Sequence, residues 1–290
     1  MSTAELVAPA AIREPARLSS RLLRSELGMI FRRRRNQAIL VVLGLVPVVI
    51  ATAVRLSTPD PADVGEGGPP FLFSIAGNGV FVALTALTVV LPLFLPLAVS
   101  VVSGDSVAGE AGQGTLRYLL VVPVDRTRLL LVKYAGSVAY CLAAALTVAV
   151  VGAGLGAILF PVGPVTLLSG STVSLAEGLG RLLLVCLYVA VMMAGLAAIG
   201  LFVSTLTESS VAAMATTSVL AVISQVLGAV PQVDWLHPWL FTNYWLDYGD
   251  LLRDPIAGDG VIRGLLATAA YVVVFGLAAW ARLSTKDVSS

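Results

Sequence analysis

The chain has 290 residues, of which 58% are hydrophobic and only 12% carry a charge, and its formal net charge is +1. Soluble globular domains contain about 45–50% apolar and about 25% charged residues, so this composition excludes an ordinary soluble domain. A single histidine and two cysteines exclude a His/Cys metal cluster and a disulfide framework. The near-neutral charge gives no indication of a nucleic-acid partner.

The first 37 residues precede any long apolar stretch and fall into two parts. Residues 1–16 show no periodicity and are predicted to be disordered. Residues 17–37 are predicted to form an amphipathic helix, because arginines recur on one face, at positions 17, 21 and 24, and apolar side chains on the other. We expect this helix to lie in the membrane interface. An orientation anchor and a contact with a cytoplasmic partner are both open roles for it.

Six stretches contain no Asp, Glu, Lys or Arg, and each is long enough to cross a membrane as a helix. They are residues 38–54, 79–103, 134–160, 182–203, 209–230 and 264–281. Lipid offers no hydrogen bonds to an open backbone, so spans of this length must be helical. We therefore predict an all-α integral membrane protein with a six-helix transmembrane domain over residues 38–281. Its second helix should be bent or loosened at Pro92 and Pro96.

Basic residues are concentrated on one side of these spans. With the N-terminus inside, fourteen basic residues lie on the cytoplasmic side and four lie outside. The positive-inside rule therefore places both termini, including the tail 282–290, in the cytoplasm. Abundant Ala, Val, Leu, Gly and Arg with only two lysines is typical of a GC-rich prokaryote, so we expect a multi-pass protein of the plasma (inner) membrane.

The two longer outer connections differ in character. Residues 55–78 are rich in Pro, Gly and Asp and are predicted to be a solvated turn. Residues 231–260 contain several Trp and Tyr side chains, which favour the headgroup level, so this segment should lie in the outer interface or dip back into it. We expect a structural role for His237, because the sequence places no partner of ligand type near it.

Polar side chains in the second and fifth spans admit two interpretations, helix packing or a substrate pathway. Packing is the commoner role of such residues. The pathway candidates are Thr85, Thr88, Ser210, Thr217, Ser224 and Gln225. Small residues at positions 152, 154 and 156, and the pair Ala194 and Ala198, permit close helix approach. No carboxylate lies within a span, which argues against a proton-coupled carrier that relies on a buried acid.

The connection between the second and third spans, residues 104–133, contains the most informative pattern. Glycines at positions 109, 112 and 114 are predicted to break the preceding helix, and Thr115 can cap a new short one. The apolar face of that helix would be Leu116, Leu119 and Leu120, and Pro123 would end it. A short, partly apolar helix on the cytoplasmic side is typical of a protein that docks on a cytoplasmic partner.

At this connection the sequence resembles the permease subunits of ABC-2 type ABC transporters. The matching pattern is G-E-x-x-x-G-T-L-x-x-L-L-x-x-P-x-x-R-x-x-L-L-x-x-K, which runs from Gly109 to Lys133. Weaker matches are the turn after the fourth span, residues 200–213, and the basic C-terminal tail, residues 282–288. The outer connection 55–78 is short, which disfavours members that capture partners outside the cell.

The resemblance implies a type V exporter-like permease that works as a dimer, either with itself or with a related permease, on two copies of a separate ABC ATPase. It implies that the short helix is a coupling helix seated in the ATPase, and that the segment Trp235–Trp245 dips into the outer membrane face. The coupling residues carried over are Glu110, Gly114, Thr115, Leu116, Leu119, Leu120, Pro123 and Arg126. The sequence contains no G-x-x-x-x-G-K-[ST] motif, so ATP and Mg are expected on the partner and no cofactor on this chain.

The resulting expectation is the membrane-spanning, non-enzymatic subunit of an ATP-driven exporter. Wide apolar spans with hydroxyl stripes suit an amphipathic or lipid-like substrate, such as a drug, an antibiotic or a lipid precursor, although the family also includes ion efflux. Two alternatives stay open. One is an ABC-type mechanotransmission or assembly module without its own substrate, and the other is a non-ABC carrier or membrane scaffold.

Overall fold

The computed structural model describes residues 20–57, 77–112 and 126–285, which are almost entirely helical. The α-helices are α1 (Ser20–Arg32), α2 (Arg34–Ser57), α4 (Val80–Val90), α5 (Phe94–Gly112), α7 (Arg126–Leu159), α8 (Leu175–Leu206), α9 (Ser210–Gly228) and α10 (Asp259–Thr285). Two 3-10 helices, η1 (Pro231–Trp239) and η2 (Asp247–Leu252), lie between α9 and α10. The short strands β1 (Val165–Thr166) and β2 (Thr172–Val173) pair antiparallel in the connection between α7 and α8.

The described helices confirm the prediction of an all-α membrane protein. Five of them, α2, α7, α8, α9 and α10, are long and apolar enough to cross a membrane. Helices α4 and α5 pass the same test together but are bent by 60°, as in a broken span or a re-entrant loop. The bend falls at Pro92, because a proline ring and a missing amide hydrogen interrupt the α-helical hydrogen bonds. Pro96 lies in the first turn of α5, where its missing amide hydrogen has no intrahelical partner to lose.

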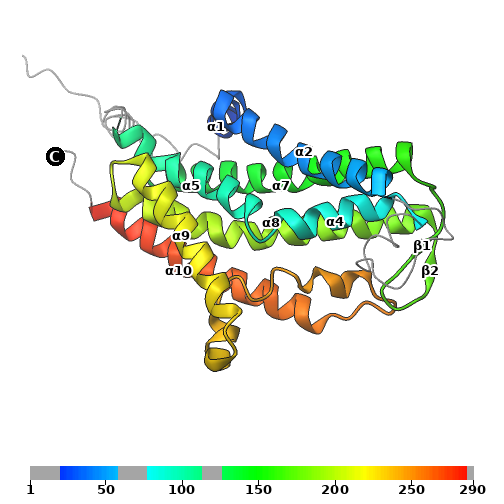
Figure 1. Ribbon diagram of the computed structural model, residues 1–290. Helices are drawn as coiled ribbons and strands as arrows, with labels where there is room; N and C mark the ends of the chain where they lie inside the picture. The colour runs from blue at the N-terminus through cyan, green and yellow to red at the C-terminus, as the bar shows by residue number, and fades with distance from the viewer. Residues whose placement is uncertain (1–19, 58–76, 113–125, 286–290) are drawn as a thin grey trace, which may run out of the picture.

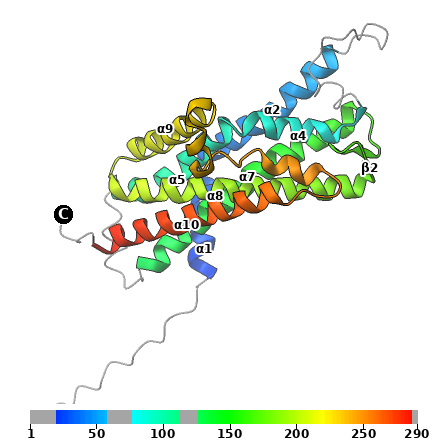
Figure 2. The ribbon, with the colours of Figure 1, turned by 90° about the horizontal axis from the view of Figure 1, so that it is seen from below.

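Helix α8 forms the centre of the bundle (Figure 1). It contacts α5, α7, α9 and α10, and most of its apolar residues are buried. The peripheral helices α2 and α10 instead leave most of their apolar side chains at least partly exposed, and Val49, Val273 and Leu277 are among the exposed ones. Apolar surface of this extent is stable against hydrocarbon and unfavourable in water, which fits a bundle surrounded by lipid. Figure 2 shows α7, α8 and α10 running along the same axis, with β2 at the end opposite the C-terminus.

Glycines bring α4 and α7 into close contact, as the sequence predicts. A Cβ atom added to Gly152 would lie 2.6 Å from the Cα of Ala83, and one added to Gly156 would overlap the carbonyl oxygen of Gly79. Gly154 differs, because a Cβ there would meet nothing within 4 Å. Gly152 and Gly156 therefore serve the α4–α7 packing, and Gly154 does not.

The amphipathic segment is shorter than the sequence indicates. The expected helix over residues 17–37 ends at Arg32, and α2 begins at Arg34 after a single non-helical residue. The break is held by Asn36, whose Nδ2 donates to the carbonyl of Ile30 at 2.9 Å. Ile30 is buried and fits over Gly136 of α7, so part of the apolar face of α1 packs on protein.

The connection between the second and third spans is also narrower than 104–133. Helix α5 continues through Gly109 to Gly112, and α7 begins at Arg126, which leaves residues 113–125 outside the described residues. The predicted break at Gly109 is wrong, since the helix continues through this residue. Glycine is needed there because a Cβ atom would lie against the carboxylate of Asp105. A glycine inside a helix costs about 1 kcal/mol relative to alanine, and the room that it gives to Asp105 offsets that cost.

The segment between α9 and α10 folds back along α10. The hydroxyl of Tyr271, twelve residues into α10, donates to the carbonyl of Trp239 at the end of η1. At a rise of about 1.5 Å per residue, this contact lies about 18 Å from the start of α10. The Nε2 atom of His237 lies 3.2 Å from the carbonyl oxygens of both Leu227 and Val230, so His237 fastens the turn after α9.

Candidate functional site

Charge is distributed unequally along the bundle. We define the basic end as α1, the first turn of α2, and the end at which α5, α8 and α10 finish and α7 and α9 begin. Among the described residues it carries ten basic and four acidic side chains, whereas the rest of the described chain carries four basic and six acidic ones. The ten are Arg21, Arg24, Arg32, Arg33, Arg34, Arg35, Arg126, Arg128, Lys133 and Arg282, and the four are Glu26, Asp105, Glu110 and Glu208.

A buried ion cluster lies inside this end and joins three helices. The Nζ atom of Lys133, two turns into α7, lies 2.6 Å from Oε1 of Glu110 on α5 and 3.5 Å from Oε1 of Glu26 on α1. The Lys133 side chain is only 2% exposed. Removing one partner of a buried ion pair costs about 3–5 kcal/mol, because the remaining charge stays desolvated. The cluster, named here the Lys133 triad, therefore fixes the positions of α1, α5 and α7 relative to one another.

A second group of charges ties α5 to the start of α2. The carboxylate of Asp105 accepts hydrogen bonds from Arg33 and, at 2.8 Å, from Nη2 of Arg35. Asp105 is buried, and it has room for this pairing because Gly109, one turn further along α5, has no side chain. Gly109 and Glu110 of the sequence pattern thus have separate structural roles, one in accommodating Asp105 and the other in pairing with Lys133.

The structure packs the weaker stretch of the family resemblance, residues 200–213, against the end of α5, where the stronger stretch begins. Ser204, in the second and weaker stretch, accepts hydrogen bonds from the backbone amides of Val107 and Ala108, at 3.0 and 2.8 Å, and donates to the carbonyl of Gly104 at 2.7 Å. Helix α5 also ends against the turn between α8 and α9, because a Cβ on Gly112 would lie 2.7 Å from the carbonyl oxygen of Glu208. A displacement of the last turns of α5 must therefore also displace the adjoining parts of α8 and α9.

Most of the predicted coupling helix cannot be placed. Gly114, Thr115, Leu116, Leu119, Leu120 and Pro123 lie outside the described residues. The two predicted residues that flank it are placed. Glu110 belongs to the Lys133 triad, and Arg126 donates from Nη1 to the carbonyls of Leu283 and Ser284, at 2.9 and 2.8 Å. Arg126 thus caps the C-terminus of α10, where a positive charge is favoured by the helix dipole.

Three of the six pathway candidates make hydrogen bonds that join elements. Thr88 shares one with the hydroxyl of Tyr248 at 2.5 Å, and Ser224 shares one with Thr242 at 2.8 Å. Gln225 donates to the carbonyl of Pro92 at the bend between α4 and α5. Thr217 donates within α9, to the carbonyl of Ala213. Thr85 and Ser210 are half-buried. These contacts fit the packing interpretation and leave the pathway interpretation a hypothesis.

Sequence reasoning missed the burial of Asp105 and Lys133, because both lie just beyond the charge-free stretches. One signal was present for Lys133, which is one of only two lysines in a chain with sixteen arginines. It also missed Arg181 at the opposite end, which donates to the carbonyls of Leu251 and Arg253, at 3.1 and 2.6 Å, and pairs with Glu177. Within the described residues no three His, Cys, Asp or Glu side chains are grouped so that they could hold a metal ion.

Comparison with known families gives one match over most of the chain. The model of the family described as "Protein of unknown function (DUF2705)" matches residues 47–289. No curated protein matches the sequence. The match includes α5, α7 and α8, and therefore Asp105, Glu110, Lys133 and Ser204, but it begins after α1 and the arginines that pair with Asp105.

Proposed function

The chain belongs to the DUF2705 family, and we propose that it is the membrane-spanning subunit of an ATP-driven ABC-2 type exporter. In this proposal the basic end faces the cytoplasm, as the positive-inside rule requires, and both termini lie there. A separate ATPase, present in two copies, binds ATP and Mg and docks at this end. A second permease, identical or related, completes the pathway in the plasma membrane.

The observation that carries the proposal is the ion pair between Glu110 and Lys133. It joins the last turn of α5 to the second turn of α7, and so brackets the segment 113–125 that resembles a coupling helix. A helix that receives force from an ATPase needs rigid attachment to the spans that it moves. The Lys133 triad supplies this attachment to α1 as well, through Glu26.

Ser204 extends the same path towards the centre of the bundle. Its hydrogen bonds to the backbone of α5 transfer a movement of that helix to α8, which contacts α9 and α10. A rigid-body change between inward-open and outward-open states can follow from such connected helices. These contacts between α5 and α8 support a role in energy transfer. In the proposal, the partner ATPase carries out ATP hydrolysis.

The polar side chains within the spans indicate the chemical class of the proposed substrate. Thr88, Ser224 and Gln225 are each engaged in hydrogen bonds between elements, and such groups do not form a ring of ligands for a small ion. The helices around them present mainly apolar side chains. This surface supports an amphipathic or lipid-like substrate, such as a drug, an antibiotic or a lipid precursor.

The test is ATP-driven transport by the complex in proteoliposomes. Deletion of residues 116–120 and the triple substitution Glu26→Met/Glu110→Met/Lys133→Met, which leaves no buried charge of the Lys133 triad unpaired, should each abolish transport while membrane insertion and dimer formation persist. The matched control is Glu177→Gln, which removes an ion pair with Arg181 at the opposite end of the bundle and should leave coupling intact. Undiminished transport by the 116–120 deletion would overturn the proposal.

A further inference from the structure

Helix α1 lies at the level where the charge-free part of α7 begins. Figure 2 shows α1 running across the long axis of the bundle. Its Glu26 pairs with Lys133 of α7, and its Ile30 fits over Gly136. The charge-free stretch 134–160 begins between these two contacts, so α1 lies at the boundary between the hydrocarbon and the lipid headgroups.

The buried face of α1 fixes the direction in which its arginines point. Glu26 and Ile30 are buried against the bundle. At about 100° per residue, three arginines lie about 120–180° around the helix from Ile30, on the side that faces away from α7. They are Arg21, Arg24 and Arg32, and all three side chains are exposed. We name this surface the arginine face.

An apolar flank lies between the buried face and the arginine face. It consists of Leu23, Leu27 and Phe31, which are half-buried. The ring of Phe31 packs against that of Tyr140 on α7, with the centroids 5.9 Å apart. Tyr140 lies about 10 Å further along α7 than Lys133, within the charge-free stretch, so this flank faces the hydrocarbon. The arginine face is therefore held at the level of the headgroups.

The charges of the arginine face are unpaired within the part of the chain that the structure describes. None of its three arginines makes a hydrogen bond or an ion pair there. The one acidic residue of α1 is Glu26, which Lys133 engages on the buried side. These cations are therefore available to an external partner.

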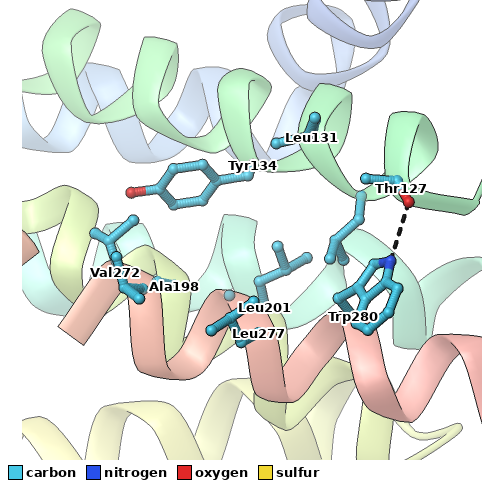
Figure 3. Close-up of a pocket in the computed structure, with 11 residues that line it drawn as sticks. Thr127, Leu131, Tyr134, Ala198, Leu201, Val272, Leu277 and Trp280 are labelled. Atoms are coloured by element: carbon cyan, nitrogen blue, oxygen red, sulfur yellow. Dashed lines mark hydrogen bonds between the residues drawn. The ribbon is translucent and has the colours of Figure 1, made fainter. Parts of the chain in front are cut away.

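Polar groups on the other side of the basic end are already paired. An apolar groove of about 470 Å³ lies there between α7 and α10 (Figure 3). At its edge the Nε1 atom of Trp280 donates to Oγ1 of Thr127 at 3.0 Å, and Arg126 caps α10. The contrast indicates that the arginine face serves a contact outside the fold rather than a contact within it.

We propose that the arginine face of α1 binds the headgroups of anionic phospholipids. The structure places these three cations at headgroup level beside an apolar flank, which is the arrangement of a helix that recognises a charged membrane surface. Each basic residue at such a surface favours an anionic lipid about fivefold, which corresponds to about 1 kcal/mol. The inference does not depend on the exporter proposal, because it rests on the position and charges of α1 alone.

The test is quenching of a fluorophore on the arginine face by phospholipids that carry a spin label near the top of an acyl chain. Ser25 is exposed on this face, and Ser25→Cys in the full chain provides a thiol for a bimane label. Cys141 and Cys186 are buried, and the unsubstituted chain is labelled in parallel to verify that they do not react. The protein is placed in phosphatidylcholine nanodiscs with a minor fraction of spin-labelled phosphatidylglycerol or spin-labelled phosphatidylcholine.

We expect stronger quenching by spin-labelled phosphatidylglycerol than by spin-labelled phosphatidylcholine. Arg24→Gln should reduce this preference about fivefold, and the triple variant Arg21→Gln/Arg24→Gln/Arg32→Gln should abolish it. These side chains are exposed and unpaired among the described residues, so the substitutions remove charge without removing a contact of the fold. The matched control is Arg263→Gln, which removes an exposed arginine at the opposite end of the bundle and should retain the preference.

Three results would overturn the proposal. Equal quenching by the two lipids would mean that the arginine face meets lipid without selecting its charge. A preference that persists in the triple variant would place the selection elsewhere on the chain. Absence of quenching by either lipid would mean that the face lies against protein or water. None of these results bears on ATP-driven transport, so the two proposals fail separately.

Discussion

Substitution of Lys133 by Met tests the structural role of the Lys133 triad. Methionine matches the length and apolar stem of lysine but removes the cation that Glu26 and Glu110 share, at 3.5 and 2.6 Å. The side chains of these glutamates are only 10% and 15% exposed, so water cannot replace the lost charge. The two carboxylates would then be desolvated and would repel each other.

The expected loss is about 4 kcal/mol, within the 3–5 kcal/mol that follows removal of one partner from a buried ion pair. A loss of this size is a large fraction of the stability of a folded protein, which is about 5–15 kcal/mol. The free energy of unfolding is measured in detergent micelles by denaturant titration, with the change in tryptophan fluorescence as the signal.

The triple variant Glu26→Met/Glu110→Met/Lys133→Met separates the loss of attraction from the cost of isolated charge. Replacing a whole buried ion cluster by well-packed hydrophobic residues of similar volume is often neutral, so this variant should regain stability to within about 1 kcal/mol of the wild type. The reasoning would be refuted by a Lys133→Met protein as stable as wild type, or by a triple variant no more stable than the single one.

Three further predictions concern other parts of the fold. Gly156→Val should destabilise the α4–α7 contact by about 1–3 kcal/mol, because its Cβ would overlap the backbone of Gly79, the residue that precedes α4. Gly154→Val should not, and thermal unfolding of the two variants checks this. Arg126→Gln should speed hydrogen exchange of the last turn of α10 about tenfold, as two carbonyls lose their cap; an unchanged rate would contradict the cap. Burial and the neighbouring Asp250 raise the pKa of Asp247 above its ordinary value. The folded protein therefore binds a proton more readily than the unfolded chain, so the free energy of unfolding should increase as the pH falls from 7 towards 5. Asp247→Asn should flatten that dependence in a pH series of melting curves.

The sequence was sufficient to predict that the chain consists of apolar helices long enough to span a membrane, because that information lies in where charge is absent. The stretch 264–281, for example, falls within α10, and the bend at Pro92 follows from proline geometry. The ends of the helices were less predictable. Gly109 marks a helix end by propensity, but its lack of a side chain accommodates Asp105 inside α5, which is a tertiary effect.

The candidate site was predicted only in part, for a similar reason. The sequence pattern includes both Glu110 and Lys133, but it does not predict that the two side chains pair or that Lys133 is buried. Whether a charge at a membrane boundary faces water or another helix depends on which helices meet there, and Glu26, the third member, is 84 residues away from Glu110 along the chain. The periodicity of a single helix does not show which other helices pack against it. The role of Arg126 as a cap on α10 likewise depends on how α7 and α10 are brought together.

The measurement that tests the central claim most directly is affinity purification from the native membrane in mild detergent, with identification and stoichiometry of the proteins that accompany the chain. The account predicts two copies of an ABC ATPase for every two permease subunits, and loss of the ATPase from the complex when residues 116–120 are deleted. Purification of the chain without any ATPase, repeated in several detergents, would contradict it.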